Sequence, residues 1–321
     1  MKNNTSGLSA LCRRVARALA LNRDAKLNFP GIFMNHSGRQ AGDGGIELDV
    51  ANDPVLRGAD GEINWTALGV LVDVALGAVT RLKAGPAMRP ATVQLHMQMT
   101  GASTRGDVAT HAQFISFSQG TGVKHCFSSA TVTAGDTLIA HASGAFVMLD
   151  LPRGTTQRAH PWVDDELLQR PLDAIDLDRE ELEAVKACTR AESAASDAHP
   201  FIDHFWCGMA KAGEGNARLT VKVTPHLGNR VGHVHGGVLL GMAAQVASAA
   251  VPASMRLSNI TAWFVSPGLG PRLKVRSKVV QQGRNLAVVH TQIVSDAGKL
   301  VLEVTSQHAA KSEQEPARTC P

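Results

Sequence analysis

The segment Asn229-Arg-Val-Gly-His-Val-His235-Gly236-Gly237 combines residue types that can polarise a carbonyl group. It leads into an apolar helix, and glycines at the start of a helix let a ligand approach the backbone closely. The first N–H groups of a helix have no partner within it, so they can donate to a carbonyl oxygen that gains negative charge. The segment therefore predicts a site for a carbonyl oxygen or oxyanion. An ordinary turn role for Asn229 and close helix packing at the glycines are the alternatives.

A second residue that can do chemistry is Asp73, which lies in the otherwise apolar segment WTALGVLVDVALGAVTRL. An ionised carboxylate among apolar side chains is unfavourable unless it is paired or functional. A structural aspartate bonded to a loop backbone is the alternative. The place of Asp73 in an internal repeat favours function.

The chain consists of two halves with the same order of elements. Each half has a glycine-rich, strand-like opening, one apolar helix and four strand-like runs. The helices are expected over residues 65–82 and 236–250. The strands are expected over 92–100, 107–118, 123–133 and 137–149, and over 258–266, 272–281, 286–294 and 299–308. Alternation of apolar and polar residues in these runs is typical of antiparallel strands with one wet face.

Both helices are apolar nearly all round and rich in Gly and Ala, which predicts burial on every side. We expect an α+β protein of two tandem domains, each a long buried helix wrapped by an antiparallel β-sheet, packed as an intramolecular pair. A generic α+β sandwich also fits the pattern. The expected divisions are an N-terminal helix over 1–24, domain 1 over 25–151, a linker with a charged helix over 152–196, domain 2 over 197–310 and a tail over 311–321.

The motif at Asn229 resembles N-x-x-G-x-x-H-G-G of the phenylacetate-pathway (PaaI-like) acyl-CoA thioesterases, a hotdog-fold family. The matching residues are Asn229, Gly232, His235, Gly236 and Gly237. The resemblance implies a tandem (double) hotdog. It also implies that Asn229 and Gly236 bind the thioester carbonyl, that His235 shapes the loop and that Gly232 and Gly237 bind substrate.

In that family an aspartate nine residues after the His acts at the partner subunit's site, where it activates water or attacks directly. Here Ala244 follows His235 at that spacing, whereas Asp73 follows Asn64, the equivalent of His235 in the first half. Nine helical residues span roughly 13.5 Å and turn a side chain by about 180°. Asp73 must therefore act at the start of the antiparallel helix of the second half. The resemblance thus predicts one composite site per chain.

The mirror-image site combines the replaced positions and is expected to be inactive. It would bring Ala244 or Gln245 to Asn64 and Trp65, and Gly58 stands where the motif has its Asn.

A hydroxyl near the start of the strand after the helix orients the attacking water in the family. Thr92, nineteen residues after Asp73, is the candidate here.

The resemblance implies hydrolysis of an acyl-CoA to a free acid and CoA, with CoA as part of the substrate and no metal or redox cofactor. Asp73 is either general base or nucleophile. A hotdog enoyl-CoA hydratase or dehydratase is a rival, although no separate acid–His pair is visible. A non-catalytic acyl-CoA binding module is another, favoured by Trp65 and Ala244. Residues such as Met97, Met99, Trp263 and Phe264 are candidates for the acyl pocket as much as for the core.

Composition excludes several other classes of protein. The net charge of +4 is mild, aromatic residues make up 4% and Tyr is absent, which disfavours nucleic-acid binding. Five scattered cysteines argue against a disulfide framework. His233 and His235 could bind a metal, but no third ligand is apparent. No apolar run is expected to reach transmembrane length, and the N-terminal apolar stretch is expected to form an amphipathic helix. We expect a cytoplasmic protein without membrane or nucleic-acid partners, and the resemblance allows a homodimer of tandem hotdogs.

Overall fold

A computed structural model describes residues 7–25, 27–120, 124–151 and 177–311. Its strands form one twelve-stranded antiparallel sheet in the order β1-β2-β4-β5-β6-β3-β9-β12-β11-β10-β8-β7. The strands are β1 (Ser37–Gln40), β2 (Ile46–Val50), β3 (Met88–Met99), β4 (Val108–Phe117), β5 (His125–Ala134), β6 (Thr137–Asp150), β7 (Lys211–Gly213), β8 (Asn216–Lys222), β9 (Met255–Phe264), β10 (Arg272–Gln282), β11 (Leu286–Ser295) and β12 (Leu300–Ala310).

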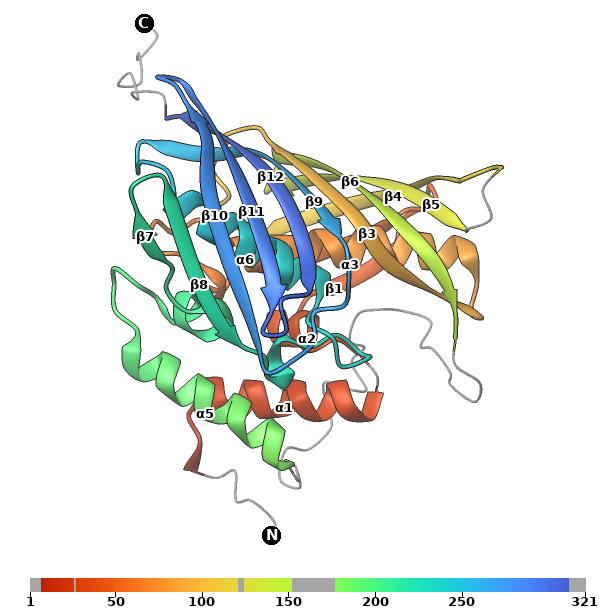
Figure 1. Ribbon diagram of the computed structural model, residues 1–321. Helices are drawn as coiled ribbons and strands as arrows, with labels where there is room; N and C mark the ends of the chain where they lie inside the picture. The colour runs from red at the N-terminus through yellow and green to blue at the C-terminus, as the bar shows by residue number, and fades with distance from the viewer. Residues whose placement is uncertain (1–6, 26, 121–123, 152–176, 312–321) are drawn as a thin grey trace, which may run out of the picture.

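Two long helices lie inside the curve of this sheet, one for each half of the chain (Figure 1). The helices are α1 (Ala10–Ala25), α2 (Phe29–Met34), α3 (Trp65–Ala84), α5 (Arg179–Ala194) and α6 (Gly236–Ala249), with short turns at η2 (Pro54–Leu56), η3 (Asp203–Cys207) and η4 (Pro225–Leu227). Strands β2 to β6 wrap α3, and β8 to β12 wrap α6. The expected α+β fold of two tandem hotdogs is therefore confirmed.

The two halves are joined in the middle of the sheet by β3 and β9. These strands pair antiparallel, with Gln94 opposite Trp263 and Gln98 opposite Asn259. One continuous sheet therefore runs through both domains, so neither helix can shift without disturbing the other half. Strand β3 begins at Met88, four residues before the expected start at Thr92.

Small residues allow the backbones of α3 and α6 to approach closely. A Cβ atom built on Gly69 would lie 2.6 Å from the carbonyl oxygen of Gly237, and one built on Gly241 would lie 2.3 Å from the Cα of Thr66. Neither position has room for a side chain. The glycines of both helices thus set the close crossing that brings the start of α6 against the middle of α3.

Helix α3 is buried over most of its length by its own sheet and by α6. The expectation that no apolar run reaches transmembrane length is wrong for this helix. Its 20 residues are long and apolar enough to cross a membrane, but 78% of the apolar window is buried inside the protein. A core helix satisfies the same criteria of length and composition, and here burial by the fold accounts for the apolar surface.

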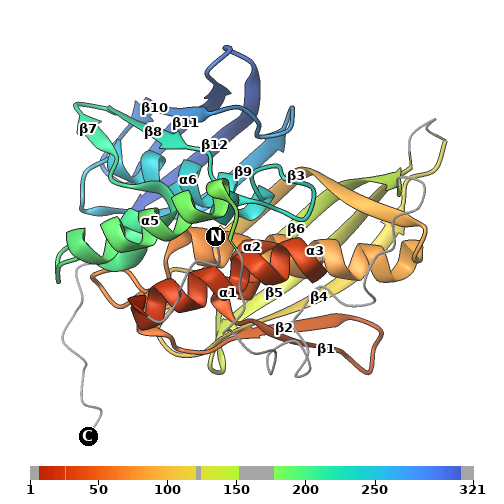
Figure 2. The same cartoon turned by 90° about the horizontal axis from the view of Figure 1, so that it is seen from below.

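Helices α1, α2 and α5 form a layer below the two domains (Figure 2). The charged segment after the first domain forms α5, whose start has a capping box between Asp178 and Glu181. Among the described residues, one group has side chains close enough to share a metal ion, namely Cys12, Cys188 and Glu192 between α1 and α5. The Cys12 thiol donates to Glu192 at 3.3 Å, so this group joins the two helices.

Candidate active site

Asp73 reaches across the helix crossing to the start of α6. Its Oδ2 accepts a hydrogen bond from the backbone N–H of Gly237 at 2.8 Å. Its Oδ1 accepts one from the Oγ1 of Thr92, on β3, at 2.8 Å. The side chain is only 7% exposed. A carboxylate from the first half is therefore held at the helix N-terminus of the second half, where the helix dipole and free N–H groups favour negative charge.

His235 is the N-cap of α6 and lies beside this carboxylate. Its Nδ1 accepts from the N–H of Gly237 at 3.1 Å and is 3.5 Å from Oδ2 of Asp73. Burial lowers the pKa of His235, and the nearby charge of Asp73 opposes this only in part. The ring is therefore neutral at pH 7, and its proton is on Nε2 because Nδ1 is an acceptor.

At Gly236 the backbone of α6 lies directly against the carboxylate of Asp73. A Cβ atom at this position would lie 2.6 Å from Oδ2 of Asp73, so no other residue fits without displacing the acid. Its N–H has no acceptor among the described residues, and the residue lines the pocket beside Asp73. This N–H is therefore a donor that a ligand oxygen can use.

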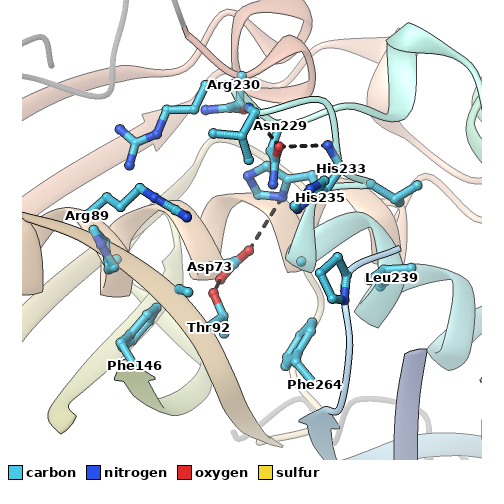
Figure 3. A pocket seen from close by; sticks show the side chains of 18 of the residues that line it. Asp73, Arg89, Thr92, Phe146, Asn229, Arg230, His233, His235, Leu239 and Phe264 are labelled. Carbon is cyan, nitrogen blue, oxygen red and sulfur yellow. Dashed lines mark hydrogen bonds and ion pairs between the residues drawn. The ribbon is translucent and has the colours of Figure 1, made fainter. Parts of the chain in front are cut away.

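Asn229 closes the turn that leads into α6. Its Oδ1 accepts from the N–H groups of Val231 and His233, at 3.0 and 3.1 Å. The amide Nδ2 has no acceptor among the described residues and points into the pocket above Asp73 (Figure 3). The turn thus fixes the amide so that its nitrogen is left for a ligand.

Two of the predicted site residues lie elsewhere. Gly232 is in the turn with a φ of +81°, where a side chain would strain the backbone, and Gly237 packs on α3. Neither lines the pocket. Gly237 contributes only its N–H, which binds Asp73.

These groups face a pocket of about 370 Å³ between the two halves. Of the predicted wall residues, Phe264 lines it, whereas Met97 is in the core and Trp263 is 44% exposed on the outer face of the sheet. The remaining lining includes Val74, Gly77, Ala78, Arg81, Arg89, Pro90, Phe146, Arg230, His233, Leu239 and residues 265–268.

The mirror-image position has the same backbone turn and helix cap but different side chains. The turn is repeated: Gly58 N–H donates to Glu62 as Asn229 N–H donates to His233, and Asn64 caps α3 as His235 caps α6. Ala244, which occupies the position in the second half that corresponds to Asp73, is buried.

The chain around η3 fills the space of this mirror-image position. The amide of Asn64 donates to Asp203 at 3.3 Å, Thr66 and Cys207 are 3.6 Å apart, and the amide of Gln245 donates to the Gly208 carbonyl at 3.4 Å. We call residues 201–208 the plug segment. These contacts occupy the polar side chains of Asn64, Thr66 and Gln245, which a ligand at this position would need.

Sequence reasoning missed three features of the site. The first is His36, which is buried near His235 and whose pKa is lowered by burial. The second is the plug segment, since no motif marks it. The third is a set of arginines, Arg81, Arg89 and Arg230, whose spacing in sequence gives no sign that they share a pocket with Asp73.

Comparison with known proteins agrees with this fold. Residues 224–308 match the family model of the acyl-CoA thioesterase N-terminal domain. A Lactobacillus plantarum protein provisionally named an oleoyl thioesterase is 12% identical, with a TM-score of 0.52 over 87% of this chain and 97% of its own. A tesB protein of Mycobacterium avium subspecies paratuberculosis is 12% identical, with a TM-score of 0.49 over 83% and 93%. The E. coli PaaI protein is 26% identical over 31% and 75%, with a TM-score of 0.29. No curated protein matches the sequence.

The second half is thus similar to an acyl-CoA thioesterase domain in sequence, and both halves share the hotdog fold of the Lactobacillus plantarum protein. Assignment to the PaaI-like type within the superfamily stays a prediction.

Proposed function

We propose that the chain hydrolyses an acyl-CoA to a free acid and CoA at one composite site between its two hotdog halves. The observation that carries the proposal is the contact of Asp73, from α3, with the N-terminus of α6, 164 residues away in sequence. Neither half contains both the acid and the donor groups. The plug segment over the mirror-image position supports a single site.

The thioester carbonyl oxygen accepts from the Gly236 N–H and from Nδ2 of Asn229. These donors are fixed before the substrate arrives, so they stabilise the oxyanion of the tetrahedral intermediate with little reorganisation. Asp73 removes a proton from water as the water oxygen attacks the carbonyl carbon. The C–S bond then breaks, and the sulfur of CoA takes up that proton. Thr92 holds Oδ1 of Asp73 and so orients the carboxylate.

Attack by Asp73 itself, through a mixed anhydride, is the second route. It needs the same donors and the same acid. Trapping with hydroxylamine during turnover separates the routes, because only an acyl-enzyme anhydride yields an Asp73 hydroxamate.

Thiol release from a panel of short, long and aromatic acyl-CoAs tests the proposal. The wild type should release CoA from at least one of them. Asp73→Asn should lower the rate by about 10²- to 10⁴-fold, as expected for loss of a general base. Gln245→Ala, which alters the mirror-image position, should stay near wild type. Thiol release that Asp73→Asn leaves intact would contradict the proposal.

A further inference from the structure

Three side chains that can bind a soft metal ion meet between α1 and α5, which lie side by side below the two domains (Figure 2). They are Cys12 on α1 and Cys188 and Glu192 on α5. One sulfur or oxygen atom of each lies within 4.8 Å of those of the other two. None of the three lines the pocket that contains Asp73, so the group is separate from the proposed active site.

The packing of the two helices and their period bring these side chains together. Cys188 and Glu192 are four residues apart, so they lie on the same face of α5 in successive turns. Cys12 is in the first turn of α1, which packs against α5. Both cysteines are almost fully buried, with Cys12 2% and Cys188 0% exposed, whereas Glu192 is half-buried. The group therefore has two enclosed soft ligands and one carboxylate that solvent can reach.

A hydrogen bond already joins the sulfur of Cys12 to the carboxylate. The Cys12 thiol donates to Oε2 of Glu192 at 3.3 Å, and its sulfur is 3.5 Å from Oγ1 of Thr189. The hydroxyl of Ser9 also donates to Oε2 of Glu192, at 2.8 Å, and accepts from the N–H of Cys12 at 3.0 Å. A divalent cation can take the place of the thiol proton, because metal binding releases that proton and uses the same sulfur and carboxylate. Ser9, bonded to both residues, would keep the carboxylate in place.

The buried sulfurs are better suited to a metal ion than to oxidation. Burial, followed by the nearby Cys12 thiol and Glu192, raises the pKa of the Cys188 thiol well above its usual range. A neutral, buried thiol reacts slowly with peroxides and disulfides, because the thiolate is the reactive form. A metal ion bound at sulfur removes the proton outright, and a metal that binds during folding needs no path into the finished structure.

We propose that Cys12, Cys188 and Glu192 bind one Zn²⁺ ion, with a water molecule as the fourth ligand. Zn²⁺ accepts thiolate and carboxylate ligands in tetrahedral sites, and thiolates select it over Mg²⁺ and Ca²⁺. Water can enter on the partly exposed side of the group, at Glu192. The ion ties α1, which packs on α2 of the first half, to α5, which packs on the plug segment of the second half. Its role is therefore structural, and the reaction at Asp73 does not involve it.

Zinc content after equilibrium dialysis tests the proposal on the full-length protein, kept reduced and first freed of metal with a chelator. The wild type should retain one Zn²⁺ per chain. Cys12→Ala and Cys188→Ala should each retain none at the same free zinc concentration. Glu192→Gln changes a partly exposed side chain, so the fold should tolerate it, and zinc should bind at least about tenfold more weakly. Cys126→Ala removes another buried thiol, on β5, and should bind zinc as the wild type does.

Co²⁺ gives a second measurement, because cobalt bound to thiolates has a charge-transfer absorption band that cobalt bound to histidines lacks. The wild type and Cys126→Ala should show this band, and Cys12→Ala should lose it. A wild type that binds no zinc, or zinc binding that Cys12→Ala and Glu192→Gln leave unchanged, would overturn the proposal. Zinc binding without the thiolate–cobalt band would assign the metal to surface histidines, and this too would overturn it. The result does not depend on whether the chain hydrolyses acyl-CoA.

Discussion

The side chains that converge in the pocket come from positions that are distant in sequence, and each has a distinct physical role. Asp73 supplies charge, Gly236 supplies an N–H, and Asn229 keeps its amide nitrogen available because its oxygen is bound in the turn. The motif predicted the residue types and the crossing from one half to the other. It could not predict the arginines, because their proximity depends on how α3, β3 and the turn pack.

Thr92 fixes the orientation of Asp73, and this can be tested separately from the acid itself. Thr92→Val removes the hydroxyl that donates to Oδ1 at 2.8 Å and keeps the side-chain volume. We expect kcat to fall by about 10- to 100-fold, since a hydrogen bond to a charged group contributes about 1.5–3 kcal/mol. Thr92→Ser restores the hydroxyl and should recover most of the rate. Equal rates for the valine and serine variants would show that the hydroxyl has no role.

At the scale of elements, the close crossing of α3 and α6 positions the site. The sequence predicted both helices and their burial from their apolar, glycine-rich composition. It did not predict which glycines lie at the crossing, because that depends on the rotation of each helix about its axis. It also missed the plug segment, whose Phe205 stacks on His226 with ring centroids 4.6 Å apart and lies tilted against Phe33 with ring centroids 5.1 Å apart.

Two glycines of α3 form a matched pair for testing the crossing. Gly69→Ala places a methyl group 2.6 Å from a carbonyl oxygen of α6, and the helices must separate. We expect the free energy of unfolding to fall by about 1–3 kcal/mol or more. Gly77→Ala meets its nearest neighbour at 3.6 Å and should gain up to about 1 kcal/mol from helix propensity. Urea denaturation measures both changes, and a neutral Gly69→Ala would contradict the tight crossing.

At the scale of the whole molecule, buried histidines make the stability of the fold depend on pH. Burial lowers the pKa of His226 and of His308 from 6.5 to about 4. Both are almost fully buried, and His226 binds the Phe205 carbonyl in the plug segment at 2.9 Å. Neutral histidines at these two places are therefore part of the folded state at pH 7.

Stability should fall as the pH drops from about 6.5 towards 4. In this window the unfolded chain takes up protons on these histidines while the folded chain does not, so acid favours unfolding. The contribution is fully present above pH 6.5 and amounts to at most about 3 kcal/mol for each group. Urea unfolding at several pH values measures the slope. His308→Gln should make the slope shallower, and an unchanged slope in that variant would contradict the assignment.

The central claim is that groups from both halves act as one site, and a double-mutant cycle on kcat/KM tests it most directly. The variants are Asp73→Asn, Asn229→Asp and the combination. Asn229→Asp keeps the oxygen that binds the turn and removes the amide donor that faces the pocket. Groups of one catalytic unit are strongly non-additive, so kcat/KM of the double variant should be about equal to that of the slower single variant. Losses that multiply would show that Asp73 and Asn229 act independently, and the single composite site would be contradicted.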